Sequence, residues 1–162
     1  MTVADDIQAS AQAAITRLEL SAARRDLAGL VSCVATVYGK PIDIKAIPAE
    51  HQLKATGLWV DFPDRGVVLY RSTDPVAYQR FSVLHELGHI VAGHSGCDLL
   101  PDEAVGPVAG ARTVRKRIPN TDVPTDSISM ETFEELVAEE TAYEFLRWLV
   151  TRPTNPAEDA FA

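Results

Sequence analysis

Three of the four histidines of this 162-residue chain lie within ten positions, in the stretch VLHELGHIVAGH (residues 83–94). In a helix, which turns about 100° per residue, His85 and His89 project from one face a single turn apart. Two imidazoles at this spacing can bind one metal ion, each with a ring nitrogen roughly 2.0–2.1 Å from a zinc. Glu86 lies to one side of the pair, where it is better placed to take a proton from an attacking water than to act as a ligand. The pattern therefore predicts a hydrolytic metal site with Glu86 as general base.

His94 is a further candidate ligand in the same stretch, but its position in the helix argues against it. A continued helix would place His94 on the opposite side from His85. Gly93 can instead end the helix and turn the chain before His94. We therefore expect a polar contact at the helix end from His94, not metal binding.

The missing ligand is expected to be a carboxylate from the acidic helix predicted over residues 129–150. The apolar face of that helix consists of Ala142, Phe145, Leu146 and Leu149. Glu139 and Glu135 lie on this side, whereas Glu140 lies nearly opposite. A carboxylate aimed into an apolar face needs a partner, and a metal ion would be one. Glu139 is the expected third ligand and Glu135, one turn earlier, the alternative; an ordinary acidic helix face would account for the other glutamates.

The elements that must position these residues predict an α+β fold in one domain, residues 1–162, with a core at about 42–150. An N-terminal helical segment (3–38) precedes three β-like runs, and the last two of these are expected to form an antiparallel hairpin. The sheet is therefore expected to be small and mostly antiparallel, with about three strands. The expected elements, in order, are strands at 42–47, 57–62 and 66–71, a histidine-bearing helix from 76 to about 92, a long loop at 95–128, the final helix, and a flexible tail at 153–162.

Composition excludes several classes of protein. The formal net charge of −8 argues against a protein that coats nucleic acid, which needs a basic face. The two cysteines lack the spacing of a metal knuckle, and a disulfide scaffold is not expected. The N-terminus carries acidic residues where an export signal needs positive charge, and no apolar run is long enough to span a bilayer. These features predict a cytoplasmic protein with no membrane or direct nucleic-acid contact.

The stretch QRFSVLHELGHIVAGH, preceded by β-like runs and followed by Glu139-x-x-Ala142-x-x-Phe145-Leu146, resembles the ImmA/IrrE-type metallopeptidases. These are small, gluzincin-like bacterial and phage proteins with a zincin-like fold, and the resemblance covers about residues 42–150. It implies one zinc per chain, bound by His85, His89 and Glu139, with Glu86 as the catalytic acid/base. The chain departs from the family pattern at Thr141 and Tyr143, and in the run WLVTRP, which replaces a common Leu-Leu-Met-Pro ending.

The resemblance also implies a function in regulatory proteolysis and transcription regulation. Members of the family cut, or are proposed to cut, a helix-turn-helix repressor, and some accompany one in toxin–antitoxin-like pairs. The expected activity is a zinc-dependent endopeptidase whose protein substrate is a helix-turn-helix regulator encoded nearby. The alternative is a regulatory protein that binds such a partner without cutting it.

Three aromatic residues are weaker candidates for substrate binding. Trp59 and Tyr70, on the expected hairpin, could line a groove in which a substrate strand pairs with a sheet edge, although such residues are more often in the core. Tyr143 could stabilise an oxyanion. The basic run at 112–117 is expected to be a solvated loop.

Overall fold

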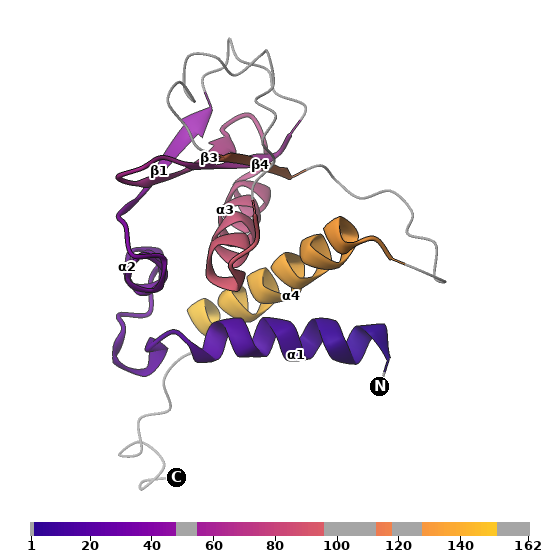
Figure 1. Cartoon of the computed structure of the whole chain (residues 1–162). Helices are drawn as coiled ribbons and strands as arrows, with labels where there is room; N and C mark the ends of the chain where they lie inside the picture. The colour runs from indigo at the N-terminus through magenta and orange to yellow at the C-terminus, as the bar shows by residue number, and fades with distance from the viewer. Residues whose placement is uncertain (1, 48–54, 96–112, 118–127, 152–162) are drawn as a thin grey trace, which may run out of the picture.

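The computed structural model describes residues 2–47, 55–95, 113–117 (backbone only) and 128–151. Figure 1 shows a sheet at one end, a helix that runs from it into the centre, and two further long helices stacked beyond. The helices are α1 (Val3–Thr16), the 3₁₀ turn η1 (Leu20–Ala22), α2 (Leu27–Tyr38), α3 (Val76–Ala92) and α4 (Met130–Val150). The strands are β1 (Ile42–Ile47), β2 (Gly57–Asp61), β3 (Gly66–Arg71) and β4 (Thr113–Arg117). The predicted α+β class is confirmed.

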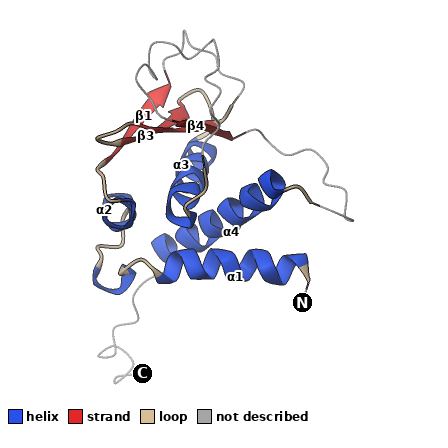
Figure 2. Ribbon diagram, viewed as in Figure 1, coloured by secondary structure: helices blue, strands red, loops and turns tan. Residues whose placement is uncertain are grey.

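The sheet has four strands in the order β1-β3-β2-β4. Figure 2 shows it at one end of the molecule, with α3 leading away from it. The expected hairpin is present, with β2 antiparallel to β3 and Trp59 opposite Val68. Two features differ from the prediction. β1 pairs in parallel with β3, because β2 reverses the chain and β1 then occupies the free edge of β3. β4 pairs antiparallel with β2. It comes from the segment expected to be a loop, and that expectation arose because the polar sequence of β4 lacks the apolar alternation of a half-buried strand.

The N-terminal segment expected to be helical (3–38) consists of two α-helices with a 3₁₀ turn between them. α1 begins with a capping box in which Thr2 accepts from the Asp5 backbone N–H and Asp5 accepts from that of Thr2. α2 begins at Asp26, whose side chain accepts from the backbone N–H of Gly29 at 2.8 Å. A Cβ at Gly29 would lie 2.0 Å from the carbonyl oxygen of Arg24, so the chain folds tightly over the start of α2. Alanine-rich composition predicts helix but does not show this change of direction.

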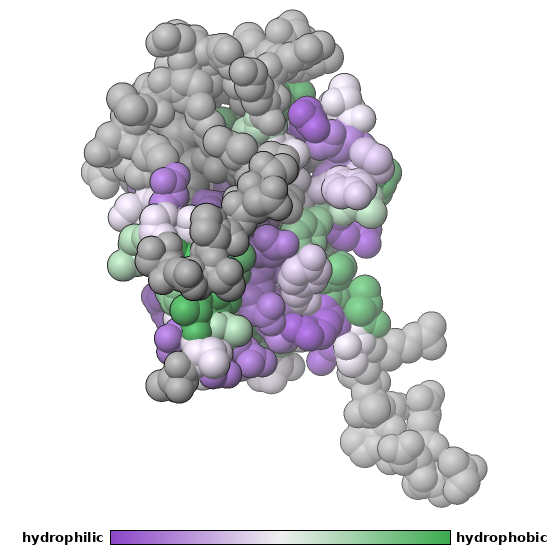
Figure 3. Space-filling model, turned by 90° about the vertical axis from the view of Figure 1, so that its right-hand side faces the viewer, coloured by the Kyte–Doolittle hydropathy of each residue, from purple (hydrophilic) through white to green (hydrophobic). Residues whose placement is uncertain are grey.

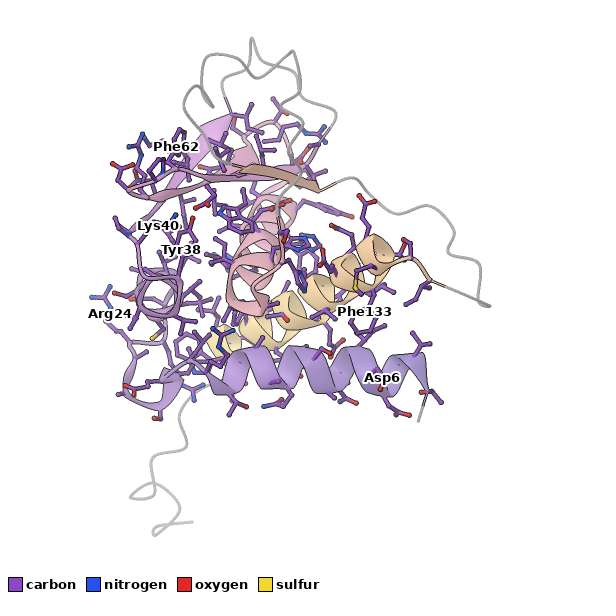
Figure 4. The ribbon with its side chains drawn as sticks, in the orientation of Figure 1. Asp6, Arg24, Tyr38, Lys40, Phe62 and Phe133 are labelled. Carbon is purple, nitrogen blue, oxygen red and sulfur yellow. The ribbon has the colours of Figure 1, made fainter. Side chains whose placement is uncertain are left out.

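A cluster of polar side chains joins α2 to the sheet. The Tyr38 hydroxyl and the Lys40 ammonium both donate to the carboxylate of Asp61, and Lys40 also donates to the carbonyl of Phe62 at 2.7 Å. Figure 4 shows Tyr38 and Lys40 next to each other between α2 and the sheet. Burial, followed by the hydrogen bond to Asp61, raises the pKa of Tyr38 well above its usual range. Tyr38 is therefore a hydrogen-bond donor that fixes α2 against β2.

α3 is the central element of the fold. Every residue from Ser82 to Val91 is buried, because the sheet, α1, α2 and α4 all pack against this helix. The apolar positions expected to pack in the core, Val83, Leu87, Ile90 and Val91, are at most 5% exposed. A helix buried on all sides is normally apolar all round. The polar residues within α3 are therefore exceptions that need a function.

α4 crosses α3 and is supported on another side by α1 (Figure 1). Phe133 projects from α4 towards α1, where it lines a depression with Ala13 and Ala14 (Figure 4). On the face drawn in Figure 3, the described residues form small hydrophobic patches between hydrophilic ones. Among the described residues, no helix is both long enough and apolar enough to cross a membrane.

Candidate metal centre

The two histidines of the HExxH stretch lie on one face of α3, as their spacing predicts. His85 is 2% exposed and His89 is fully buried. Their Nε2 atoms are 3.0 Å apart. The two buried imidazoles thus turn their Nε2 atoms towards each other, an arrangement in which one metal ion can bind both nitrogens.

Glu135 of α4 supplies the third group. Its two carboxylate oxygens lie 3.2 Å from Nε2 of His85 and 3.3 Å from Nε2 of His89. The side chain of Glu135 is 24% exposed, whereas both histidines are buried. Each of the three residues offers one ligand atom within 4.8 Å of the other two.

Glu139, the ligand expected from the helical phase, is not in this group. It lines a surface depression with Ala4, Ile7 and Gln8 of α1. The buried face of α4 consists of Val137, Ala138, Thr141, Ala142 and Phe145. That face is rotated away from the stripe assumed from the sequence, because α4 packs against both α3 and α1. The rotation turns Glu139 towards α1.

The sequence spacing that favoured Glu139 occurs twice in α4. Glu139-x-x-Ala142 and Glu135-x-x-Ala138 have the same pattern one helical turn apart. The structure distinguishes them at Gly88, where a Cβ would lie only 2.7 Å from the carbonyl oxygen of Ala138. The two helices therefore make their close contact at Ala138, one turn beyond Glu135.

Glu86 lies on the sheet side of the histidines and is fully buried. A Cβ at Gly57 of β2 would be 2.9 Å from Oε1 of Glu86 and 3.4 Å from Cβ of Ser82. The carboxylate thus occupies the space that a side chain at this position of β2 would fill. Sequence reasoning missed Gly57, and the only available signal was a glycine at the first position of a predicted strand.

His94 makes the polar contact expected at the end of α3. Gly93 has φ 72° and ψ 27°, a left-handed conformation that suits glycine and ends the helix. Nδ1 of His94 lies 2.9 Å from Nδ1 of His89, on the opposite edge of that ring from the shared Nε2. His94 contacts a candidate ligand and is not one of the three grouped residues.

The aromatic candidates lie in different surroundings. Trp59 is 6% exposed and packs edge-on to Tyr38, with ring centroids 6.0 Å apart. Tyr70 is partly buried against the same core. Tyr143 is 47% exposed and its ring lies 4.9 Å from that of Phe81, one turn before His85 on α3. Of the basic run at 112–117, only the backbone of β4 is described, and most of the 95–128 segment and the 153–162 tail lie outside the described residues.

The nearest nitrogen–nitrogen and nitrogen–oxygen separations within the three-residue group are close to those of a zinc site. A tetrahedral zinc with bonds of about 2.05 Å separates its ligand atoms by about 3.3 Å. The two Nε2 atoms are 3.0 Å apart, and the distances to Glu135 are 3.2 Å from His85 Nε2 to Oε2 and 3.3 Å from His89 Nε2 to Oε1. Two imidazoles and a carboxylate are also an established donor set for a catalytic zinc, which leaves one position open. The residues present therefore fit a single zinc ion.

The family described as the IrrE N-terminal-like domain, Peptidase_M78, matches residues 42–122, from β1 to just beyond β4. No curated protein and no solved structure shows significant similarity to the chain. The match ends before α4, so the part played by Glu135 depends on the structure alone. Because the match spans half of the chain and contains both histidines of the three-residue group, the chain belongs to the Peptidase M78 family of metallopeptidases.

Proposed function

We propose that the protein is a zinc-dependent endopeptidase that cuts a DNA-binding regulator of the helix-turn-helix or antitoxin type. The observation that carries the proposal is the convergence of His85, His89 and Glu135 on one point beside the buried carboxylate of Glu86. His85 and His89 would hold the ion from α3, and Glu135 would hold it from α4. This replaces Glu139, the ligand expected from the sequence, by the residue one turn earlier.

When bound, the zinc would polarise the scissile carbonyl and make water a better nucleophile at neutral pH. The protein's own contribution is to hold Glu86 as general base. Glu86 would take a proton from the attacking water and deliver it to the leaving amine. The absence of a side chain at Gly57 leaves the space that this carboxylate occupies.

The choice of substrate class draws on the family and on charge. The net charge of −8 favours encounter with a basic protein, and DNA-binding domains are basic because they neutralise phosphates. The same charge disfavours a direct contact with nucleic acid. A DNA-binding substrate would be met in the cytoplasm, which is the proposed location of the reaction.

The test is co-expression with a helix-turn-helix regulator encoded by a neighbouring gene. Wild-type protein should fragment the regulator, whereas Glu86→Gln should leave it intact while still binding about one zinc per chain. Measuring the zinc content distinguishes a variant that has lost only the general base from one that has lost the metal site. Fragmentation by Glu86→Gln at the wild-type rate would refute the role of Glu86. Capture of an intact regulator by wild-type protein would instead support the non-proteolytic alternative.

A further inference from the structure

The end of α3 brings a third imidazole against one of the candidate ligands. The backbone N–H of His94 donates to the carbonyl of His89 at 3.1 Å, and the two Nδ1 atoms are 2.9 Å apart. One residue therefore contacts both the backbone and the ring of His89. A helix continued through Gly93 would carry His94 away from this ring by about 140°.

The direction of the hydrogen bond follows from the chemistry of imidazole. A histidine that binds a metal through Nε2 uses the lone pair of that nitrogen, and its one remaining proton is on Nδ1. In His89 that proton points at His94, so Nδ1 of His89 donates. Nδ1 of His94 must then accept, and the proton of His94 is on its Nε2. The two rings thus satisfy each other only in one pair of tautomers.

We propose that His94 is a positioning residue for the metal centre, which holds the ring of His89 in the tautomer and orientation that direct Nε2 at the ion. The inference rests on the proposed zinc site. Partners of this kind fix the ring and raise the basicity of the ligand nitrogen, and their loss commonly costs 10- to 100-fold in metal affinity. Gly93 has the function of bringing His94 to this position, since its left-handed conformation is unfavourable for other residues.

The inference is tested with two substitutions at His94, using zinc alone as the probe. In His94→Leu the side chain keeps apolar contacts but cannot accept a hydrogen bond. In His94→Asn the side-chain oxygen lies near the former position of Nδ1 and can accept one. Competition with a chromophoric chelator should show zinc affinity reduced about 10-fold or more in His94→Leu and largely restored in His94→Asn.

A measurement on the unaltered protein keeps the test independent of folding defects. Long-range ¹H–¹⁵N spectra of the zinc-loaded wild type should show a proton on Nδ1 of His89 and none on Nδ1 of His94. The opposite tautomers would overturn the inference. Wild-type affinity in His94→Leu would also overturn it, while leaving the zinc site standing.

Cobalt substitution distinguishes positioning from ligation. The visible spectrum of the cobalt-loaded His94→Asn protein should match that of the wild type, because the ligand atoms are unchanged. A different coordination spectrum would make His94 a ligand and overturn the positioning role. A wild type that binds neither zinc nor cobalt would refute the proposed metal site, a result distinct from failure of the His94 contact.

Discussion

Gly57 is the residue of β2 that faces Glu86, and its lack of a side chain leaves room for the buried carboxylate. A methyl group here would lie 2.9 Å from Oε1 and 3.3 Å from Cγ of Glu86, so the carboxylate must move. The three atoms nearest to such a methyl group belong to Glu86 and Ser82, and none is a ligand atom of the three-residue group. At the scale of single residues, the general base is thus positioned separately from the metal ligands.

The substitution Gly57→Ala should therefore separate catalysis from metal binding. A displacement of the base by about 1 Å can cost on the order of 100-fold in rate. We expect a loss of that size in cleavage of the regulator, with the zinc content of the purified protein unchanged. Both quantities can be measured on one preparation. Cleavage by the Gly57→Ala variant at the wild-type rate would show that Glu86 does not need this space.

At the scale of elements, the site depends on how closely α4 approaches α3. The contact of Gly88 with the backbone of Ala138 sets the separation of the two helices and, through it, the place of Glu135. Gly88→Ala would introduce a Cβ 2.7 Å from a carbonyl oxygen, which cannot rotate away as a side chain can. Such overpacking costs about 1–3 kcal/mol.

We expect Gly88→Ala to weaken zinc binding and to lower the melting temperature. The added methyl group would push α3 and α4 apart and so move Glu135 away from the histidines. Gly39→Ala is the matched control. Gly39 has φ 80° at the end of α2, so alanine is strained there, but nothing lies within 4 Å of the added Cβ. The control should lose stability and keep its zinc affinity. Equal zinc affinity in the two variants would contradict the proposed role of the helix contact.

The cap of α2 gives a pH-dependent prediction. The backbone N–H of Gly29, and then Arg24, lower the pKa of Asp26 below its ordinary value of 3.8. A lowered folded-state pKa means that the cap stabilises the protein fully above the ordinary value and is lost as the pH falls through the lowered one. A carboxyl ¹³C titration should give Asp26 a midpoint below 3.8.

Asp26→Ala should lower the melting temperature at pH 7, and Asp26→Asn should lower it less, because asparagine keeps a capping oxygen but loses the charge that pairs with Arg24. The difference in melting temperature between the wild type and Asp26→Ala should narrow as the pH falls and the carboxyl of Asp26 becomes protonated. If that difference in melting temperature stays constant through the titration of Asp26, the charge of the cap contributes nothing to stability.

The sequence was a reliable guide to individual elements and a weaker one to their packing. The predicted ends of α3, at 76 and about 92, agree with the structure, and two apolar runs around a short turn predicted the hairpin. The break between α1 and α2 was not predicted, because it depends on Asp26 and Gly29 acting together. Glu135 and Glu139 could not be distinguished, because the neighbours of α4 set its rotation and both glutamates precede an alanine by three residues.

At the scale of the whole molecule, parts far apart in the chain converge on one centre. The family match covers the sheet and α3, whereas α1 and α4 lie outside it. A single domain over residues 1–162 stays a prediction. α1 packs against both α3 and α4. The N-terminal helix thus supports the helix that carries Glu135, and the sheet supports the helix that carries the histidines. A metal ion bound between α3 and α4 would join the part formed by the sheet and α3 to the part formed by α1 and α4.

The most direct test of this account is the zinc dissociation constant of Glu135→Ala, measured beside that of Glu139→Ala. The two residues have the same side chain on the same helix, one turn apart, so each variant controls for the other. Glu135→Ala should bind zinc at least about tenfold more weakly, because it loses a charged ligand. Glu139→Ala should bind zinc as the wild type does, because Glu139 faces α1. Loss of zinc in Glu139→Ala with retention in Glu135→Ala would contradict the arrangement of α4 and the proposed metal centre.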